Sequence, residues 1–486
     1  MKDGLRMLGL EWRLLRADAA AWVAVLLFAA ALSYSYFNGY VRWGRQHAGT
    51  DNLTRQWEEN RVQKQQRLQW ISGAPAGAVT HTELDWGPRQ PQWAAVWVGA
   101  TAILPPAPLG WLLIGRSDVQ PSVHIATVWR GTEPTVPTTE NPVKLLIGPF
   151  DPAFVLLYLF PLLILGLTFN LVATEREDGT LRLLLSQPVS LRALLLRRAV
   201  VRGAVIGAAG IVIGGVSLAA THPVQGEASV LRLAMCLAGV ALYGLFWMGL
   251  AFWVNVWGRS PAANALVVFG AWIALALVIP ALAAVTSTFL FPVPSRAGFI
   301  DFERATRLEL YNATPTPEEK EARDAALLAA LFSRHPELRN TAGLNRGRLL
   351  NAAQGEEHEL RLAALERQFQ EQRIRQRALV RAFGILSPTM LLEDGLTALS
   401  GNSDERHDDY LFQAESFFHD SKRFFWPLIF RGTLFNAVDY DRIPRFVYRE
   451  EPLRSVTARA LLPLGALTAA ALCMAAFAWF RGRATL

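Results

Sequence analysis

The segment Ala173–Ser190, ATEREDGTLRLLLSQPVS, places charged residues between two long apolar runs. Four charged residues, from Glu175 to Asp178, are followed by a glycine and then by four leucines between Leu181 and Leu185. Acidic side chains at the start of a helix stabilise it by interacting favourably with the helix dipole. They can also form ion pairs with basic residues of a partner protein. Exposed apolar clusters are typical of docking surfaces. The residue types therefore predict protein binding rather than catalysis.

Residue types that start, turn and end helices recur in the same segment. A Thr-x-x-Glu pattern can form a capping box, glycine permits a sharp turn, and proline ends a helix. These residue types predict a short helix, or a pair of helices, in the segment. They leave open which residue forms the N-terminal cap. The residues concerned are Thr174 with Glu177 as a capping box, Gly179 as a turn, Thr180 as the cap of a helix Leu181–Leu185, Pro188 as an exit, and Ser190 as the cap of the next helix.

The remainder of the chain predicts a membrane protein. Of 486 residues, 52% are hydrophobic and 18% charged, whereas soluble domains average about a quarter charged. A bilayer core needs roughly 20 apolar residues per helix. The fold class predicted is mainly α, a polytopic membrane protein with about six transmembrane helices, at residues 19–37, 152–173, 199–220, 230–254, 262–290 and 458–480.

Basic residues predict the orientation of these spans. They concentrate in residues 1–18, in the segment 174–198, beside Arg259, and in the tail 481–486. The positive-inside rule makes that side cytoplasmic, so both termini are expected in the cytoplasm. Residues 1–18 predict an amphipathic helix on the lipid surface, with an apolar stripe of Leu5, Leu8, Trp12 and Leu15. The net charge of +7 is explained by the basic residues that flank the spans on the cytoplasmic side. Because the sequence also contains no nucleic-acid-binding motif, no nucleic-acid partner is expected.

Two large regions then lie outside the cell membrane. Region 38–151 predicts a helix rising from the first span, followed by a small mixed α/β module, and region 291–457 predicts a helical bundle. The apolar stretch Trp93–Gly115, broken by prolines, is interpreted as part of the first module, with a re-entrant or spanning segment as the alternative. We expect the two regions to pack together, with Trp86 and Trp93 as candidate contacts. His407 and Asp408 are interpreted as solvated helix positions rather than metal ligands, and no metal site is expected.

Small residues in the third span favour close helix packing. Gly203, Gly207, Gly210 and Gly214 form two G-x-x-x-G patterns. The pattern leaves open whether the partner helix belongs to the same subunit or to another. Pro280 predicts a kink in the fifth span.

The motif Glu175-x-Glu177-x-Gly179-Thr180-Leu181, followed by Leu184-Leu185-Ser186-x-Pro188-Val189-Ser190, resembles the coupling-helix segment of type-2 ABC exporter permeases. The similarity is closest to permeases of nitrous-oxide-reductase maturation and gliding-motility systems. Glu11-Trp12-Arg13 with Arg16 resembles the connecting helix of the same group. The two large outer insertions depart from the simplest members and resemble a sub-family described only as a domain of unknown function.

The resemblance implies a transporter subunit that is not itself an enzyme. Two copies of a separate ATPase, which bind ATP and Mg²⁺, would dock beneath this segment, and a second permease copy or a related permease would complete the pathway. The coupling residues would be Glu175, Glu177, Gly179, Thr180, Leu181, Leu184, Leu185 and Pro188. No cofactor is expected in this chain, which contains no G-x-x-x-x-G-K-[ST] phosphate-binding motif.

Two other functions are compatible with a polytopic chain. One is a membrane-anchored enzyme, although neither Gly-x-Ser-x-Gly nor H-E-x-x-H occurs. The other is a sensor or scaffold, although no cytoplasmic segment is long enough for a signalling domain. The sequence does not identify the substrate: lipid, peptide, siderophore-like metabolite and maturation factor remain open.

Overall fold

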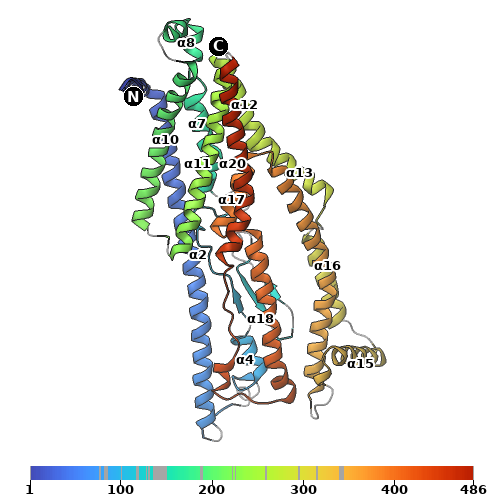
Figure 1. The fold of residues 1–486 in the computed structure, drawn as a ribbon. Coiled ribbons are helices and arrows are strands. Elements are labelled where there is room, and N and C mark those ends of the chain that lie inside the picture. Colours follow the sequence, from blue (N-terminus) through green and yellow to red (C-terminus); the bar gives the residue numbers. More distant parts are fainter. Residues whose placement is uncertain are drawn as a thin grey trace.

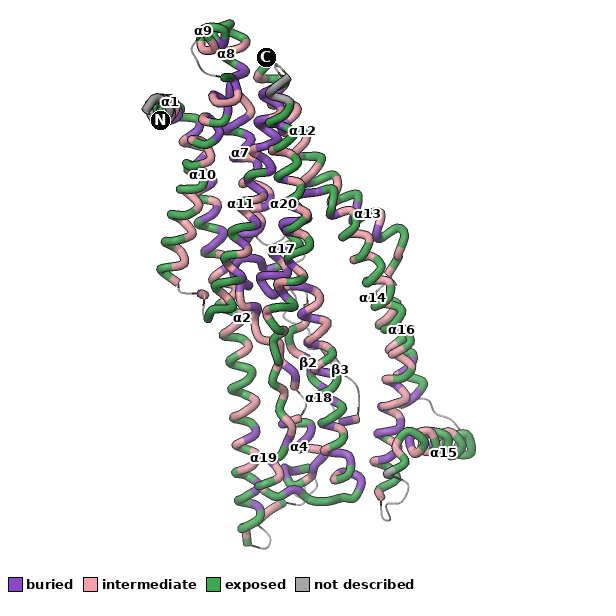
Figure 2. Tube along the Cα trace, in the orientation of Figure 1, coloured by how far each residue is buried: buried purple, intermediate pink, exposed green. Residues whose placement is uncertain are grey.

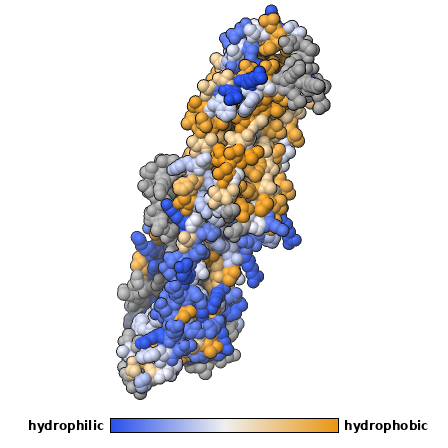
Figure 3. All heavy atoms as spheres, turned by 90° about the vertical axis from the view of Figure 1, so that its left-hand side faces the viewer, coloured by the Kyte–Doolittle hydropathy of each residue, from blue (hydrophilic) through white to orange (hydrophobic). Residues whose placement is uncertain are grey.

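The computed structural model describes residues 2–75, 78–80, 86–99, 101–115, 120–126, 128–129, 132–134, 150–186, 190–221, 223–224, 226–257, 260–293, 296–312, 316–338 and 344–484. Six helical segments are long and apolar enough to cross a membrane, which confirms the predicted number and the mainly α fold class. They form one elongated bundle with both termini at the same end, and the remaining chain extends beyond the opposite end (Figure 1). We call this extension the distal body. Apolar side chains cover the spans on the face drawn in Figure 3, and polar side chains cover the distal body.

Each span agrees with a predicted run but has its own bounds. Several begin earlier than predicted, because polar residues at the bundle ends continue the helix. The spans are α2 (Ala19–Gly73), the segment α6–η1–α7–α8 (Pro152–Phe154, Val155–Leu159, Phe160–Thr168, Ala173–Glu177), α10 (Leu191–Thr221), α11 (Gly226–Val256), α12–η2–α13 (Pro261–Trp272, Ile273–Val278, Ile279–Leu290) and α20 (Leu453–Ala484).

Helices α11 and α20 form the centre of the bundle (Figure 2). Glycines permit the close approach: a Cβ at Gly239 would lie 2.8 Å from Leu464 Cδ2, and a Cβ at Gly249 would lie 3.1 Å from Met474 Cγ. The apolar core continues into the segment at Leu109 to Leu113 and into α17 (Pro388–Ser400).

The segment Leu109 to Leu113 and helix α17 are both predicted to lie in the outer regions, and the structure differs for both. Part of the stretch Trp93–Gly115 lies in the core of the spans, beside Tyr36 and Ala153, rather than wholly in a separate module. Helix α17 was expected in the outer bundle, yet it packs between α11 and α20. Its apolar residues, including Leu392 and Leu396, are buried there. A stretch of 13 residues is too short to cross a bilayer, so span length gave no signal for it.

The fifth span departs from a regular helix near Pro280. A π-helical segment, η2, ends just before this residue, and α13 then diverges from the bundle (Figure 1). Proline has no N–H to donate and its ring clashes with the preceding turn, which explains the irregularity. The predicted kink is confirmed.

The distal body contains the far half of α2, a small sheet and a group of helices. In the sheet, β1 (Thr101–Ile103) pairs antiparallel with β2 (Val123–Ala126), and β2 with β3 (Thr132–Pro134). The helices are α4 (Pro91–Trp97), α14 (Arg296–Arg307), η3 (Leu308–Asn312), α15 (Pro317–Arg334), η4 (Pro336–Leu338), α16 (Arg346–Gly384), α18 (Asp404–Arg431) and α19 (Asp439–Arg442). A capping box formed by Thr316 and Glu319 begins α15.

The two predicted outer regions pack on one another, as expected. Tyr440 donates a hydrogen bond to the carbonyl of Pro88 (3.0 Å), and Arg61 forms an ion pair with Asp441 (2.9 Å). Trp93 stacks on Trp86, with ring centroids 4.7 Å apart, but Trp86 is 59% exposed. Trp86 therefore stacks on a residue of its own region and is otherwise largely exposed to solvent.

A buried cluster joins β2 to α18. His124 Nδ1 lies 3.0 Å from the Tyr410 hydroxyl, and His407 packs against the same ring. Arg406 is buried beside it. The interpretation of the His407 segment as solvated was therefore wrong, because the face of α18 that carries it is covered by the sheet of the other region.

This cluster predicts a pH-dependent stability. Burial, with a smaller contribution from the charge of His407, lowers the pKa of His124 from 6.5 to about 4. The unfolded chain therefore binds more protons than the folded one between these values, and stability is full above pH 6.5 and declines as the pH falls towards 4. We expect a loss of up to about 3 kcal/mol. Thermal unfolding between pH 7.5 and 4.5 measures it, and an equal slope in the His124→Gln variant would contradict the assignment.

Candidate coupling site

Two short helices project beyond the ends of the spans, at the end that carries both termini (Figure 1). They are α8 (Ala173–Glu177) and α9 (Leu181–Leu185). Gly179 separates them with φ +73°, a left-handed conformation that favours glycine, so the predicted turn is confirmed. The structure therefore has a helix–turn–helix where a single coupling helix was one of the expectations.

The four leucines of α9 have different environments. Leu181 is buried against Leu171, Leu195 and Phe252. Leu184 and Leu185 are partly buried on the same cluster, whereas Leu183 is 72% exposed. The prediction of an exposed cluster of four leucines was therefore wrong for three of them, because α9 folds back onto the ends of α10 and α11. Only Leu183, which was not among the predicted coupling residues, offers a fully exposed apolar side chain in α9.

The caps differ from the predicted ones. Thr174 does not cap α8: the N-cap position is Val172, which makes no side-chain cap, and the Thr174 N–H donates to Asn170 Oδ1 (3.0 Å). Thr180 precedes α9 but its hydroxyl donates to the Glu175 carbonyl (3.2 Å) and makes no cap. Ser190 accepts from the Ala193 N–H (3.3 Å), as predicted. Pro188 lies outside the described residues.

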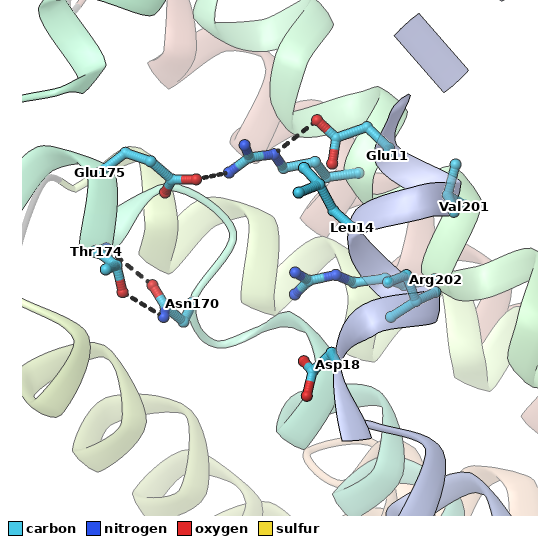
Figure 4. Close-up of a pocket in the computed structure, with 10 residues that line it drawn as sticks. Glu11, Leu14, Asp18, Asn170, Thr174, Glu175, Val201 and Arg202 are labelled. Atoms are coloured by element: carbon cyan, nitrogen blue, oxygen red, sulfur yellow. Dashed lines mark hydrogen bonds and ion pairs between the residues drawn. The ribbon is translucent and has the colours of Figure 1, made fainter. Parts of the chain in front are cut away.

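An arginine of α10 links α8 to the N-terminal helix α1 (Lys2–Ala17). Arg198 Nη1 donates to Glu175 Oε1 (2.7 Å), and its Nε donates to Glu11 Oε1 (3.1 Å). Figure 4 shows the two carboxylates approaching this guanidinium from opposite sides. Arg198 also donates to the Leu171 carbonyl at the break before α8. One buried side chain thus joins three elements.

A polar cavity of about 330 Å³ lies between these three elements. The charged residues that line it are Glu11, Asp18, Glu175, Arg198 and Arg202. Asn170 and Thr174 also line it (Figure 4). Asp18 also caps α2, accepting from the Ala21 N–H (3.1 Å). The lining carries three carboxylates and two guanidinium groups, so its charges nearly balance.

A buried asparagine of α11 fixes the bend that leads into α8. Asn255 Oδ1 accepts from the Leu171 N–H (2.9 Å), and its Nδ2 donates to the Thr168 carbonyl (2.9 Å). Backbone groups freed where a helix breaks in an apolar region need such partners. Asn255 and Arg198 were not predicted as site residues. The signal available was a polar side chain within an apolar span, which is rare unless it has a role.

On the opposite face of α8 and α9, side chains point into solvent. Glu177, Asp178, Arg182 and Leu183 are exposed. Within the described part of the chain, no ion pair of Glu177 or Arg182 is formed. The structure thus separates the predicted acidic pair: Glu175 is held inside the protein, and Glu177 remains available.

The glycines of α10 also divide into two groups. A Cβ at Gly203 would lie 2.9 Å from Met248 Cε, so this glycine permits α10 to approach α11. A Cβ added at Gly207, Gly210 or Gly214 would meet no atom of a neighbouring described residue within 4 Å. Ile211 on the same part of the helix is exposed. The far part of α10 therefore presents a smooth, exposed apolar face (Figure 2).

Comparison with known families matches most of the chain. The model of a family described as ABC-2 family transporter protein matches residues 7–314, and a model described as a domain of unknown function (DUF3526) matches residues 302–449. No curated protein and no solved structure matches the chain. The first match includes most of α1, the first five spans, α8 and α9, and the second includes most of the distal helices.

Proposed function

Because the chain belongs to the ABC-2 family of transporter proteins, we propose that it is the permease subunit of an ATP-driven exporter in the bacterial inner membrane. The family is a membrane component of transport and is not itself catalytic. A separate ATPase, binding ATP and Mg²⁺, supplies the energy. The observation that supports this most is the anchored pair α8–α9, which exposes Glu177 and Leu183 beyond the spans.

The coupling residues divide into two roles in this proposal. Glu177 and Leu183 contact the ATPase, because they are exposed on α8 and α9. Glu175, Leu181, Leu184 and Leu185 hold the two helices on the bundle, and Gly179 and Thr180 shape the turn. Closure of two ATPase subunits then pushes α8–α9 as one body, and Arg198 carries the displacement to α1 and α10.

This role is tested by capture of the partner in cells. A photo-crosslinking amino acid at Leu183 should bind an ATPase with a phosphate-binding loop, and the same group at buried Leu181 should not. Placed at Gly210, it should bind a second permease copy, since a small-residue face permits close packing between subunits. Lipid adducts alone at Gly210 would exclude that face as the subunit interface. Failure to capture any ATPase at Leu183 would exclude α9 as its docking surface.

The same proposal requires α8–α9 to be cytoplasmic and the distal body to be outside. In a variant with Cys236 and Cys473 replaced by alanine, single cysteines at exposed Asn60 and Gln370 should react with an impermeant thiol reagent in spheroplasts. A cysteine at exposed Asp178 should react only after permeabilisation. The reverse pattern would invert the orientation and exclude the docking proposal.

A further inference from the structure

Arg232 is a buried cation that has no counter-ion of its own among the described residues. It lies in the second turn of α11, where the spans meet the distal body, and only 5% of its surface is exposed. Within that part of the chain its Nε has no hydrogen-bond acceptor, and the side chain forms no ion pair. An unpaired charge is costly to bury, so charged groups in protein interiors normally have a counter-ion.

The carboxylates nearest to Arg232 already bind other arginines. Arg406 Nε donates to Glu450 Oε2 (3.1 Å), and Arg459 Nη1 donates to Glu451 Oε1 (2.9 Å). These four residues are the charged groups that act on Arg232. Three arginines and two glutamates leave an excess of one positive charge. The buried Nε of Arg459 also has no acceptor in the described part of the chain.

The backbone at the end of α17 lies close to the guanidinium and has no side chain there. Arg232 Nη1 lies 3.5 Å from the position that a Cβ would take at Gly401, the residue that ends α17. Gly401 has φ +85°, which favours glycine, and a side chain there would also lie 2.9 Å from Pro108 Cδ. The end of α17 contributes only the partial negative charge of a helix C-terminus. It does not neutralise a full cation.

We propose that Arg232, with Arg459 beside it, forms a binding site for a phosphate group at the distal end of the spans. The planar fork of a guanidinium matches phosphate oxygens, and a singly charged phosphodiester balances the excess charge. The group belongs either to a phospholipid headgroup, which lies at this depth of a bilayer, or to a phosphorylated solute. The site does not depend on the ATPase proposal and is tested without an ATPase.

Thermal unfolding of delipidated, purified permease in detergent tests this site. Phosphatidylglycerol, inorganic phosphate and diacylglycerol are added separately. We expect a rise of about 2–5 °C in Tm with phosphatidylglycerol if the source is lipid, or with inorganic phosphate if it is a solute, and none with diacylglycerol. Arg232→Gln should lose this rise. Arg454→Gln, which removes an exposed arginine nearby, should keep it.

The Tm measured without added phosphate distinguishes a binding role of Arg232 from a structural one. Without added phosphate, Arg232→Gln should be at least as stable as the parent, because the substitution removes a buried charge that has no counter-ion in the described structure. A lower baseline Tm would show that Arg232 stabilises the fold itself and would overturn the proposal. So would a full phosphate-dependent rise in Arg232→Gln, or the absence of a rise with every phosphate probe in the parent.

Discussion

Replacing Leu183 by aspartate should prevent the ATPase from binding while leaving the permease folded. The side chain is 72% exposed, so its loss costs the isolated subunit little. Burial of a leucine at an interface contributes about 1.5–3 kcal/mol, which corresponds to roughly 10-fold to 150-fold in affinity for Leu183→Ala. Aspartate adds the cost of burying a carboxylate. Affinity for the ATPase, measured with purified components, checks the expectation.

Two further variants distinguish docking from folding. Leu181→Ala creates a cavity in a buried cluster and should lower the stability of the permease itself by about 2–5 kcal/mol. Leu196→Ala removes an exposed leucine of α10 at the same end of the bundle and should change neither property. Parent-like ATPase affinity and transport in Leu183→Asp would mean that α9 is not the docking surface.

Arg198→Ala should destabilise the permease more than any substitution on the exposed face of α8 or α9. The guanidinium is buried and lies between Glu11 and Glu175, so its removal leaves two partly buried carboxylates close together. Breaking a buried ion pair from one side costs about 3–5 kcal/mol. The variant should also separate α1 from α8, so ATP hydrolysis should continue with little transport. Thermal unfolding and transport assays in proteoliposomes measure the two effects.

Two control variants, Arg198→Lys and Arg182→Ala, test this second prediction. Lysine keeps the charge but lacks the fork that reaches both carboxylates, so Arg198→Lys should recover only part of the stability. Arg182→Ala removes an exposed arginine of α9 and should leave stability unchanged. Equal stability of Arg198→Ala and the parent would mean that the three-element contact contributes nothing to the fold.

Features governed by local sequence were predictable. The spans follow from runs of apolar residues, the turn at Gly179 from the conformational freedom of glycine, and the kink from Pro280. Each of these depends on residues within a few positions of one another, so the chain itself contains the necessary information.

Features that depend on contacts between residues distant in the sequence could not be predicted from it. The environment of Leu181 depends on α10 and α11, and the backbone before α8 is held by Asn255 of α11, which accepts from the Leu171 N–H. A motif contains no information about which of its residues face the protein. Consequently the sequence predicted where the short helices lie, but not that Leu183 is the most exposed leucine of α9.

The uninterrupted length of α2 has a mechanical consequence. The helix runs from the cap at Asp18 to Gly73 without a proline, which makes it a rod of about 80 Å. Its near end adjoins α1, and its far end is attached by Arg61 to Asp441 of the distal body. A tilt of about 5° around its midpoint moves each tip by about 3.5 Å, in opposite directions. A single continuous helix thus connects the end of the bundle that carries the termini to the distal body, so a tilt of α2 as a rigid rod displaces both ends together.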